Sequence, residues 1–155
     1  EKLDESLEII TGLWSGKPFS FSGKHYRMQK TVFLPTPLQK PRVPIWVGGF
    51  WPRARPFMRA AKWDGAIPLV LPGRLARPAE MSDILAFIKK HRASLSDFDL
   101  VEINWTTGGN RESNAAKVSQ YVKAGITWWL ESMYTMRDSP ERMLKRIRQG
   151  PPGIQ

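Results

Sequence analysis

Apolar residues recur every three or four positions over the first fourteen residues, and this spacing predicts an amphipathic helix. The helix should end near Gly16, because glycine readily adopts the left-handed conformation of a C-terminal cap and Pro18 blocks continuation. Apolar and polar residues then alternate on both sides of a Ser22-Gly23 turn, in Phe19–Phe21 and again in His25–Met28. Alternation around a glycine turn predicts a small β-hairpin.

The rest of the chain switches repeatedly between short apolar runs and helical periodicity. Four prolines between residues 34 and 44 first predict an extended connector. The predicted strands are Ile45–Val47, Ala66–Ile67, Leu100–Trp105 and Ile126–Leu130. The predicted helices run from Arg55 or Pro56 to Trp63, from Pro78 to His91, from a cap at Ser113 or Asn114 to Ala124, and from Pro140 to the stop at Gly150-Pro151. This alternation implies parallel strands joined by right-handed crossovers.

Short strands separated by helices fit a (β/α) barrel better than an open sheet. A closed barrel of this kind has eight strands and about 250 residues, whereas this chain has 155 residues. The pattern therefore predicts an α/β fold equivalent to half of a TIM (β/α)8 barrel. About four parallel strands with their helices would follow an N-terminal helix and a small hairpin.

Composition narrows the chemistry that the chain can support. With 0 Cys, neither disulfides nor thiolate chemistry is possible. The two histidines, His25 and His91, are far apart in the sequence, so we expect no transition-metal site. No apolar run is long enough to span a bilayer and no signal peptide pattern opens the chain, which makes a cytoplasmic location the expectation.

The formal net charge of +10 is compatible with a nucleic acid, an anionic membrane or a phosphorylated ligand as partner. The basic residues are scattered, however, and no run of them is longer than two. Scattered charge is more typical of a solvated surface. We therefore expect no membrane binding and no specific nucleic-acid binding.

The most informative segment is the glycine pair Gly48-Gly49, which follows an apolar run and precedes a basic, helix-compatible stretch. In a strand–loop–helix unit, backbone N–H groups at this point can bind an anion. Arg53 and Arg55 could add positive charge to such a site, although solvated arginines would look the same. A structural interpretation also stays open, because two glycines can simply allow a tight turn.

Weaker candidates follow the later predicted strands. The turn from Thr106 to Gly109 and the pair Glu131-Ser132 would lie at the catalytic face of a barrel, but an ordinary turn and a structural salt bridge explain them as well. His25 fits surface packing better than catalysis, and Trp128-Trp129 fits packing. No catalytic triad or phosphate-loop motif is present, so we assign no catalytic residue.

An ordered set of motifs resembles the luciferase-like flavin monooxygenases, a family that includes oxidoreductases using the deazaflavin coenzyme F420. The motifs are Trp14–Lys17, Phe21–Tyr26, Pro35–Pro41, Pro44–Gly49, Ala60–Gly65 and Tyr121–Ser132. The resemblance covers nearly the whole chain, but only the C-terminal half of the family's domain. It implies that residues 1–155 are the C-terminal half of a luciferase-like TIM barrel, incomplete without an N-terminal half.

The resemblance also implies a function. The chain would belong to a flavin- or F420-dependent oxidoreductase or monooxygenase that binds FMN or F420 and a small-molecule substrate. The cofactor phosphate would lie near the backbone of Gly48, Gly49, Phe50 and Trp51, with Arg53 contributing charge. The partner would be the N-terminal half of the same barrel or another copy of the chain. The alternatives are a non-catalytic half-barrel that associates with itself or a partner and, less favoured, a basic nucleic-acid-binding module.

Overall fold

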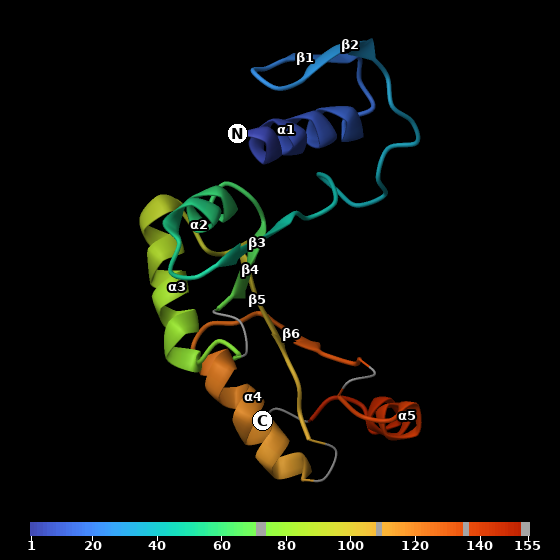
Figure 1. Ribbon diagram of the computed structural model, residues 1–155. Coiled ribbons are helices and arrows are strands. Elements are labelled where there is room, and N and C mark those ends of the chain that lie inside the picture. Colours follow the sequence, from blue (N-terminus) through green and yellow to red (C-terminus); the bar gives the residue numbers. More distant parts are fainter. Residues whose placement is uncertain (71–73, 108–109, 135–136, 153–155) are drawn as a thin grey trace. The chain divides into compact units, whose positions relative to one another are not determined.

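A computed structural model of the chain shows helices and strands in the predicted order (Figure 1). It describes residues 1–70, 74–107, 110–134 and 137–152. Pro72 and Gly73, together with Gly108 and Gly109 of the turn predicted from Thr106 to Gly109, lie outside the described residues. The chain divides into two compact units, residues 1–44 and 45–155, and each unit has its own sheet.

The first unit confirms the predicted helix and hairpin. It consists of α1 (Lys2–Trp14) and the antiparallel strands β1 (Phe19–Ser22) and β2 (Arg27–Thr31). Gly16 has a φ of 67°, as expected of a residue that follows a helix end. The Glu5 carboxylate on α1 accepts hydrogen bonds from the backbone N–H groups of Lys24, His25 and Tyr26, with donor–acceptor distances of 2.9–3.3 Å. These bonds attach the hairpin turn to α1.

The second unit contains a four-stranded sheet with the order β3-β4-β5-β6. Its strands are β3 (Trp46–Phe50), β4 (Gly65–Leu69), β5 (Asp99–Asn104) and β6 (Trp128–Glu131), and every pair of neighbours is parallel. Its helices are α2 (Ala54–Ala60), α3 (Pro78–His91), α4 (Arg111–Lys123) and α5 (Pro140–Arg148). The predicted α/β fold with four parallel strands is therefore confirmed.

Strand β3 is longer than predicted, because it continues through the glycine pair to Phe50. Gly48 and Gly49 pair with Ile67 and Pro68 of β4, so neither glycine lies in a loop. The second strand was predicted to stop at Ile67, before Pro68, but Pro68 lies inside β4. A proline is tolerated there because the pairing of β4 with β5 ends at Ala66, so no bond to β5 is lost.

Helix α2 begins at Ala54 and ends at Ala60, whereas the prediction ran from Arg55 or Pro56 to Trp63. Pro56 lies in the first turn, where backbone N–H groups lack an intrahelical partner in any case. At the other end the chain tightens into turns, with the N–H of Lys62 bonded to the carbonyl of Arg59 at 2.9 Å.

Helix α4 ends at its C-cap Ala124 as predicted, but its start differs from the prediction. Asn110, not Ser113 or Asn114, is the N-cap residue, and its side chain accepts a hydrogen bond from the Ser113 N–H at 3.0 Å. At the far end Gly125 has a φ of 98°, and the N–H of Ile126 bonds back to the carbonyl of Tyr121. Ile126 therefore completes the helix cap, and β6 begins two residues later than predicted.

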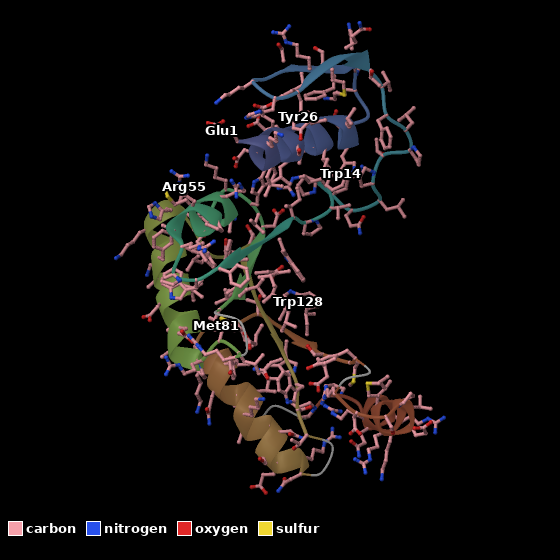
Figure 2. All side chains as sticks on the ribbon, viewed as in Figure 1. Glu1, Trp14, Tyr26, Arg55, Met81 and Trp128 are labelled. Carbon is pink, nitrogen blue, oxygen red and sulfur yellow. The ribbon has the colours of Figure 1, made fainter. Side chains whose placement is uncertain are left out.

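Helices α2, α3 and α4 lie on one side of the sheet (Figure 1). On this face Val47, Ala66 and Leu100 are buried. Buried side chains from the helices pack with them, including Phe57 of α2 and Met81 of α3, which points toward the sheet in Figure 2. This layer is the hydrophobic core of the second unit.

The opposite face of the sheet carries exposed apolar side chains. Phe50, Leu69, Ile103 and Trp128 are 43%, 42%, 37% and 49% exposed. Trp128 is labelled in Figure 2, and its ring centroid lies 5.4 Å from that of Trp46. In a closed barrel this face would be the packed interior.

Candidate functional site

Parallel strands end at the same edge of a sheet, and in barrels of this type active sites lie at that carboxyl edge. Here the edge is formed by Phe50 and Leu69, which are paired at the ends of β3 and β4, and by Asn104 and Glu131, which are paired at the ends of β5 and β6. Two groups of polar or side-chain-free residues occur along it. One surrounds the glycine pair, and the other lies beside α5.

Gly48 leaves an open space on the exposed face of the sheet. A Cβ atom added at Gly48 would have one neighbour, the Ile67 carbonyl oxygen at 3.9 Å, which is ordinary contact distance. Gly48 alternates with Trp46 and Phe50, so it lies on the same face as these aromatic side chains. The absent side chain would let a ligand approach the backbone closely at this point.

Gly49 faces the other way and has a structural role. A Cβ atom at Gly49 would lie 2.2 Å from the Cβ of Pro56, which is far inside van der Waals contact. Only glycine lets α2 pack this closely against β3. The two glycines therefore serve different purposes, a distinction that the sequence motif does not show.

Trp51 and Arg53 are also placed differently from each other. The Trp51 N–H donates to the Leu69 carbonyl at 2.8 Å, and its ring packs edge-on against Phe57 and Phe87, with centroids 5.3 and 5.8 Å away. Both its backbone donor and its ring are therefore engaged within the fold. Arg53 is exposed at the N-cap position of α2, and its backbone N–H donates to the Phe50 carbonyl.

The second group links the ends of β5 and β6 to α5. Thr106 is fully buried, and its N–H and hydroxyl donate to the Glu131 carboxylate at 2.8 and 3.1 Å. The same hydroxyl oxygen accepts from the Arg146 guanidinium of α5, from Nε at 3.1 Å and from Nη2 at 2.7 Å. Arg137 pairs with Glu131 at 3.0 Å. This group brings together Glu131, predicted as a candidate, with two arginines that the sequence did not single out.

Glu131 is ionised in this setting. Its partial burial disfavours the charge, but hydrogen bonds from the Thr106 N–H, the Trp129 indole and Arg137 outweigh burial and hold its pKa below the ordinary value. The predicted structural salt bridge for Glu131 is thus present. Ser132, the residue after it, contributes its backbone carbonyl as an acceptor for Arg137.

A third polar cluster lies on the helix-covered face of the sheet. Glu102 and Asn104 of β5 are almost completely buried, and Asn104 donates to Glu102 at 2.8 Å. The Lys117 ammonium of α4 donates to the Asn104 side-chain oxygen at 2.9 Å, and the Asn104 side-chain nitrogen donates to the Tyr121 hydroxyl of α4 at 3.3 Å. Burial raises the pKa of Glu102 to about 7. The burial of Glu102 could have been inferred from the sequence. In a strand, Leu100 and Glu102 lie on the same face, so burying Leu100 also buries Glu102.

Other sequence candidates have partners that fit a structural role. His25 lies in the first unit, where its ring Nε2 is 3.1 Å from the Glu1 carboxylate. Thr107 bonds the Asn114 side chain through its N–H at 2.9 Å, which fits the structural interpretation of this turn. Trp129 packs against Tyr121, with ring centroids 5.5 Å apart.

Two further properties concern the described part of the chain. In it, His, Asp and Glu side chains do not gather in a group of three that could hold a metal ion. Over the same ranges, the helices lack the length and apolar character needed to cross a membrane. The arrangement at the sheet edge can offer exposed backbone, apolar contacts and cationic side chains to a ligand.

Sequence comparisons place these features among known proteins. The family described as luciferase-like monooxygenase matches residues 1–122. A 65-residue segment is 42% identical to an uncharacterised protein of Mycobacterium tuberculosis, covering 42% of this chain and 21% of that protein. A 57-residue segment is 35% identical to the oxygenase component of a flavin-dependent trigonelline monooxygenase of Acinetobacter baylyi, covering 37% of this chain and 16% of that protein.

Solved structures share the fold at low sequence identity. An F420-dependent secondary alcohol dehydrogenase, in complex with an F420–acetone adduct, superimposes with a TM-score of 0.71 at 13% identity, covering 92% of this chain and 57% of that chain. The coenzyme F420-dependent tetrahydromethanopterin reductase of Methanopyrus kandleri gives a TM-score of 0.68 at 13% identity, covering 93% and 59%. The chain thus spans less than two thirds of the proteins that it matches.

The family match covers most of the chain, and the structural matches share its strand–helix order and its parallel sheet. The resemblance carried by the sequence motifs is therefore confirmed. The chain belongs to the luciferase-like monooxygenase family.

Proposed function

We propose that the chain forms the C-terminal half of a luciferase-like barrel domain in a flavin- or F420-dependent oxidoreductase, with a small molecule as its substrate. The observation that carries this proposal is the side-chain-free surface at Gly48, directly before the carboxyl edge of the sheet. Family membership and the shared fold support it. FMN and F420 both remain compatible, since the related proteins include users of a flavin and of F420.

The residues at β3 fit a phosphate-bearing aromatic cofactor in part. Gly48 allows close approach of a ligand to the backbone, Phe50 offers an exposed apolar side chain, and Arg53 offers an exposed cation near the strand end. Gly49 and Trp51 would support this surface from behind, because one accommodates Pro56 and the other packs against Phe57. When bound, the cofactor supplies the hydride or oxygen chemistry, and the protein positions it and excludes water.

The experiment that tests this site compares Gly48→Val with Gly49→Ala in the full-length protein. We expect Gly48→Val to keep the thermal stability of the wild type and to weaken the affinity for FMN or F420 by about tenfold or more, which is over 1 kcal/mol of binding. We expect Gly49→Ala to lower stability, because its methyl group collides with Pro56. Each cofactor is titrated separately by fluorescence.

Unchanged affinity in a folded Gly48→Val variant would contradict the site at β3. The wild type should bind FMN or F420 at a cofactor concentration of roughly 1 mM, the upper end of the usual range of KM values. If neither cofactor binds at that concentration, the oxidoreductase assignment itself is contradicted. Activity is not needed as a readout, so the test is independent of the unidentified substrate.

A second candidate function is a non-catalytic half-barrel that associates with itself or with a partner. The exposed apolar face at Phe50, Leu69 and Ile103 favours it, because apolar sheet faces of this kind are normally covered. It predicts association without binding of FMN or F420. The cofactor titrations above therefore separate the two functions.

A further inference from the structure

The surface beside α5 contains a pocket of about 240 Å³ that is rich in positive charge. Four cationic side chains line it, Arg137, Arg142, Lys145 and Arg146, and they face one lining carboxylate, Asp138. The pocket lies next to the carboxyl ends of β5 and β6, because Arg146 is bonded to Thr106 and Arg137 to Glu131. It is therefore at the catalytic edge of the sheet but on a different strand pair from Gly48.

Arg146 is the central feature of this pocket. Its side chain is buried, at 9% exposure, and its guanidinium donates to the Thr106 hydroxyl and the Gly150 carbonyl, which are both neutral acceptors. Among the described residues, no carboxylate lies within the 4.0 Å of an ion pair with it. The nearest carboxylate in its hydrogen-bond network is that of Glu131, which is reached only through the Thr106 hydroxyl and is already paired with Arg137. A buried guanidinium without a direct ion pair offers a pre-oriented partner to an anion that enters the pocket.

The other cations of the pocket differ in how far they are neutralised. Arg137 is paired with Glu131 at 3.0 Å, so its charge is already compensated. Arg142 approaches Asp138 at 3.4 Å, but its side chain is largely exposed and the pair is weak. Lys145 is exposed at the rim. The excess of positive charge therefore comes from Arg146 with Arg142 and Lys145 on the same helix.

An apolar hollow of about 330 Å³ adjoins the pocket. Its walls include Trp129, Ile147 and Pro151, and it shares Met133 and Arg146 with the charged pocket. The Glu131 carboxylate also lines the hollow, but it is paired with Arg137. Arg146 thus lies where a cationic surface meets an apolar one. A ligand that has both an acidic group and an apolar body would match the two surfaces together.

We propose that the α5 pocket binds the phosphate or carboxylate group of a small molecule whose apolar part lies in the adjoining hollow. The anion site is inferred from the residues that line the pocket. Its use for a substrate rests on the proposed oxidoreductase function. The acidic group can belong to a substrate or to the cofactor, and the test separates these two sources.

The experiment titrates inorganic phosphate into the full-length protein at low ionic strength and follows binding by phosphorus NMR line broadening. Arg146 supports Thr106, so its replacement could disturb the fold, and the rim variants Arg142→Gln and Lys145→Gln are used in its place. We expect each to weaken phosphate binding several-fold and the two together by about tenfold or more, as for loss of charged hydrogen bonds. Arg148→Gln is the matched control, because Arg148 is an exposed cation of the same helix outside the pocket lining.

The expected result is selective weakening in the pocket variants with less than twofold change in Arg148→Gln. Equal effects in all three variants would mean that phosphate responds to net charge only, and would overturn the proposal. The titration is then repeated with saturating FMN, F420 and riboflavin, the last of which lacks a phosphate. If phosphate binding is unchanged with every cofactor present, the pocket belongs to a substrate. If FMN or F420 displaces phosphate but riboflavin does not, the anion site is supported and belongs to the cofactor. That second result would contradict the placement of the cofactor phosphate at Gly48.

Discussion

At the scale of single residues, the buried cluster around Glu102 is the most unusual feature of the second unit. Glu102 accepts a hydrogen bond from Asn104, and the charged groups that act on it are Lys117 of α4 and Glu80 of α3. Burial raises its pKa to about 7, against the opposing influence of Asn104 and Lys117. Burial also lowers the pKa of Lys117. The cluster lies under the helices, so we interpret it as structural.

This pKa predicts a pH-dependent stability. Because the folded pKa of about 7 exceeds the ordinary value of 4.5, the folded state binds the proton more tightly than the unfolded state. The stability due to this proton is fully present below pH 4.5 and is lost as the pH rises to 7. Glu102→Gln should remove this dependence and stabilise the protein at pH 8 by about 3 kcal/mol, since one pKa unit corresponds to about 1.4 kcal/mol.

The measurement is urea unfolding of the wild type and Glu102→Gln at pH 5 and pH 8. Glu112→Gln is the control, because Glu112 is exposed in the first turn of the same helix that covers Glu102. If the wild type and Glu102→Gln lose the same stability between the two pH values, the buried carboxyl group does not titrate in this range.

At the scale of elements, the ends of helices and strands depend on individual hydrogen bonds. The Asn110 side chain caps α4, while Asn114 is buried and bonds the Thr107 N–H at 2.9 Å. Two asparagines four positions apart at the start of the same helix therefore have different roles. In β3 the same is true of the glycine pair, where one residue faces the open side of the sheet and the other faces α2.

We predict that Asn110→Ala destabilises the protein by about 1 kcal/mol, the usual effect of losing an N-cap side chain. Ser113→Ala should change stability much less, because Ser113 contributes its backbone N–H to the cap and keeps it in the variant. Melting temperatures of the two variants provide the measurement. A larger loss in Ser113→Ala than in Asn110→Ala would show that the cap is assigned to the wrong residue.

At the scale of the whole molecule, the second unit presents an apolar sheet face and two strand edges. β3 and β6 are the first and last strands of the sheet, so each lacks a strand partner on one side among the described residues. Open edges and exposed apolar faces favour pairing with another chain. The N-terminal half of a barrel or a second copy of the chain would satisfy both.

We expect the isolated 155-residue chain to self-associate at micromolar concentration. Replacing Leu69 and Ile103 with Thr should shift it toward the monomer, because both side chains are exposed on the open face. Val122→Thr is the control, since Val122 is similarly exposed, at 44%, but lies on α4. Sedimentation velocity gives the masses. A wild-type monomer that unfolds cooperatively would contradict the need for a partner.

The sequence by itself determined the order of the elements and the family. Helical spacing, alternation and proline positions are local properties, and they predicted α1, the hairpin, α3 and α5 closely. The end of α1 at Gly16 and the start of α3 at Pro78 follow from the backbone preferences of these two residues alone. The motifs from Trp14 to Ser132 were enough to identify the family, which the match over residues 1–122 confirms.

The tertiary structure decided which side each residue of a strand faces and which distant groups meet. Strand alternation places Gly48 and Gly49 on opposite faces. Only the packing of α2 against β3 shows that Gly49 is the one that faces Pro56. Likewise, Arg146 and Thr106 are 40 residues apart in the chain, and nothing local indicates that the guanidinium reaches the hydroxyl. Burial and long-range contacts are properties of the folded sheet, and for that reason the α5 pocket and the Glu102 cluster could not be predicted from the sequence pattern alone.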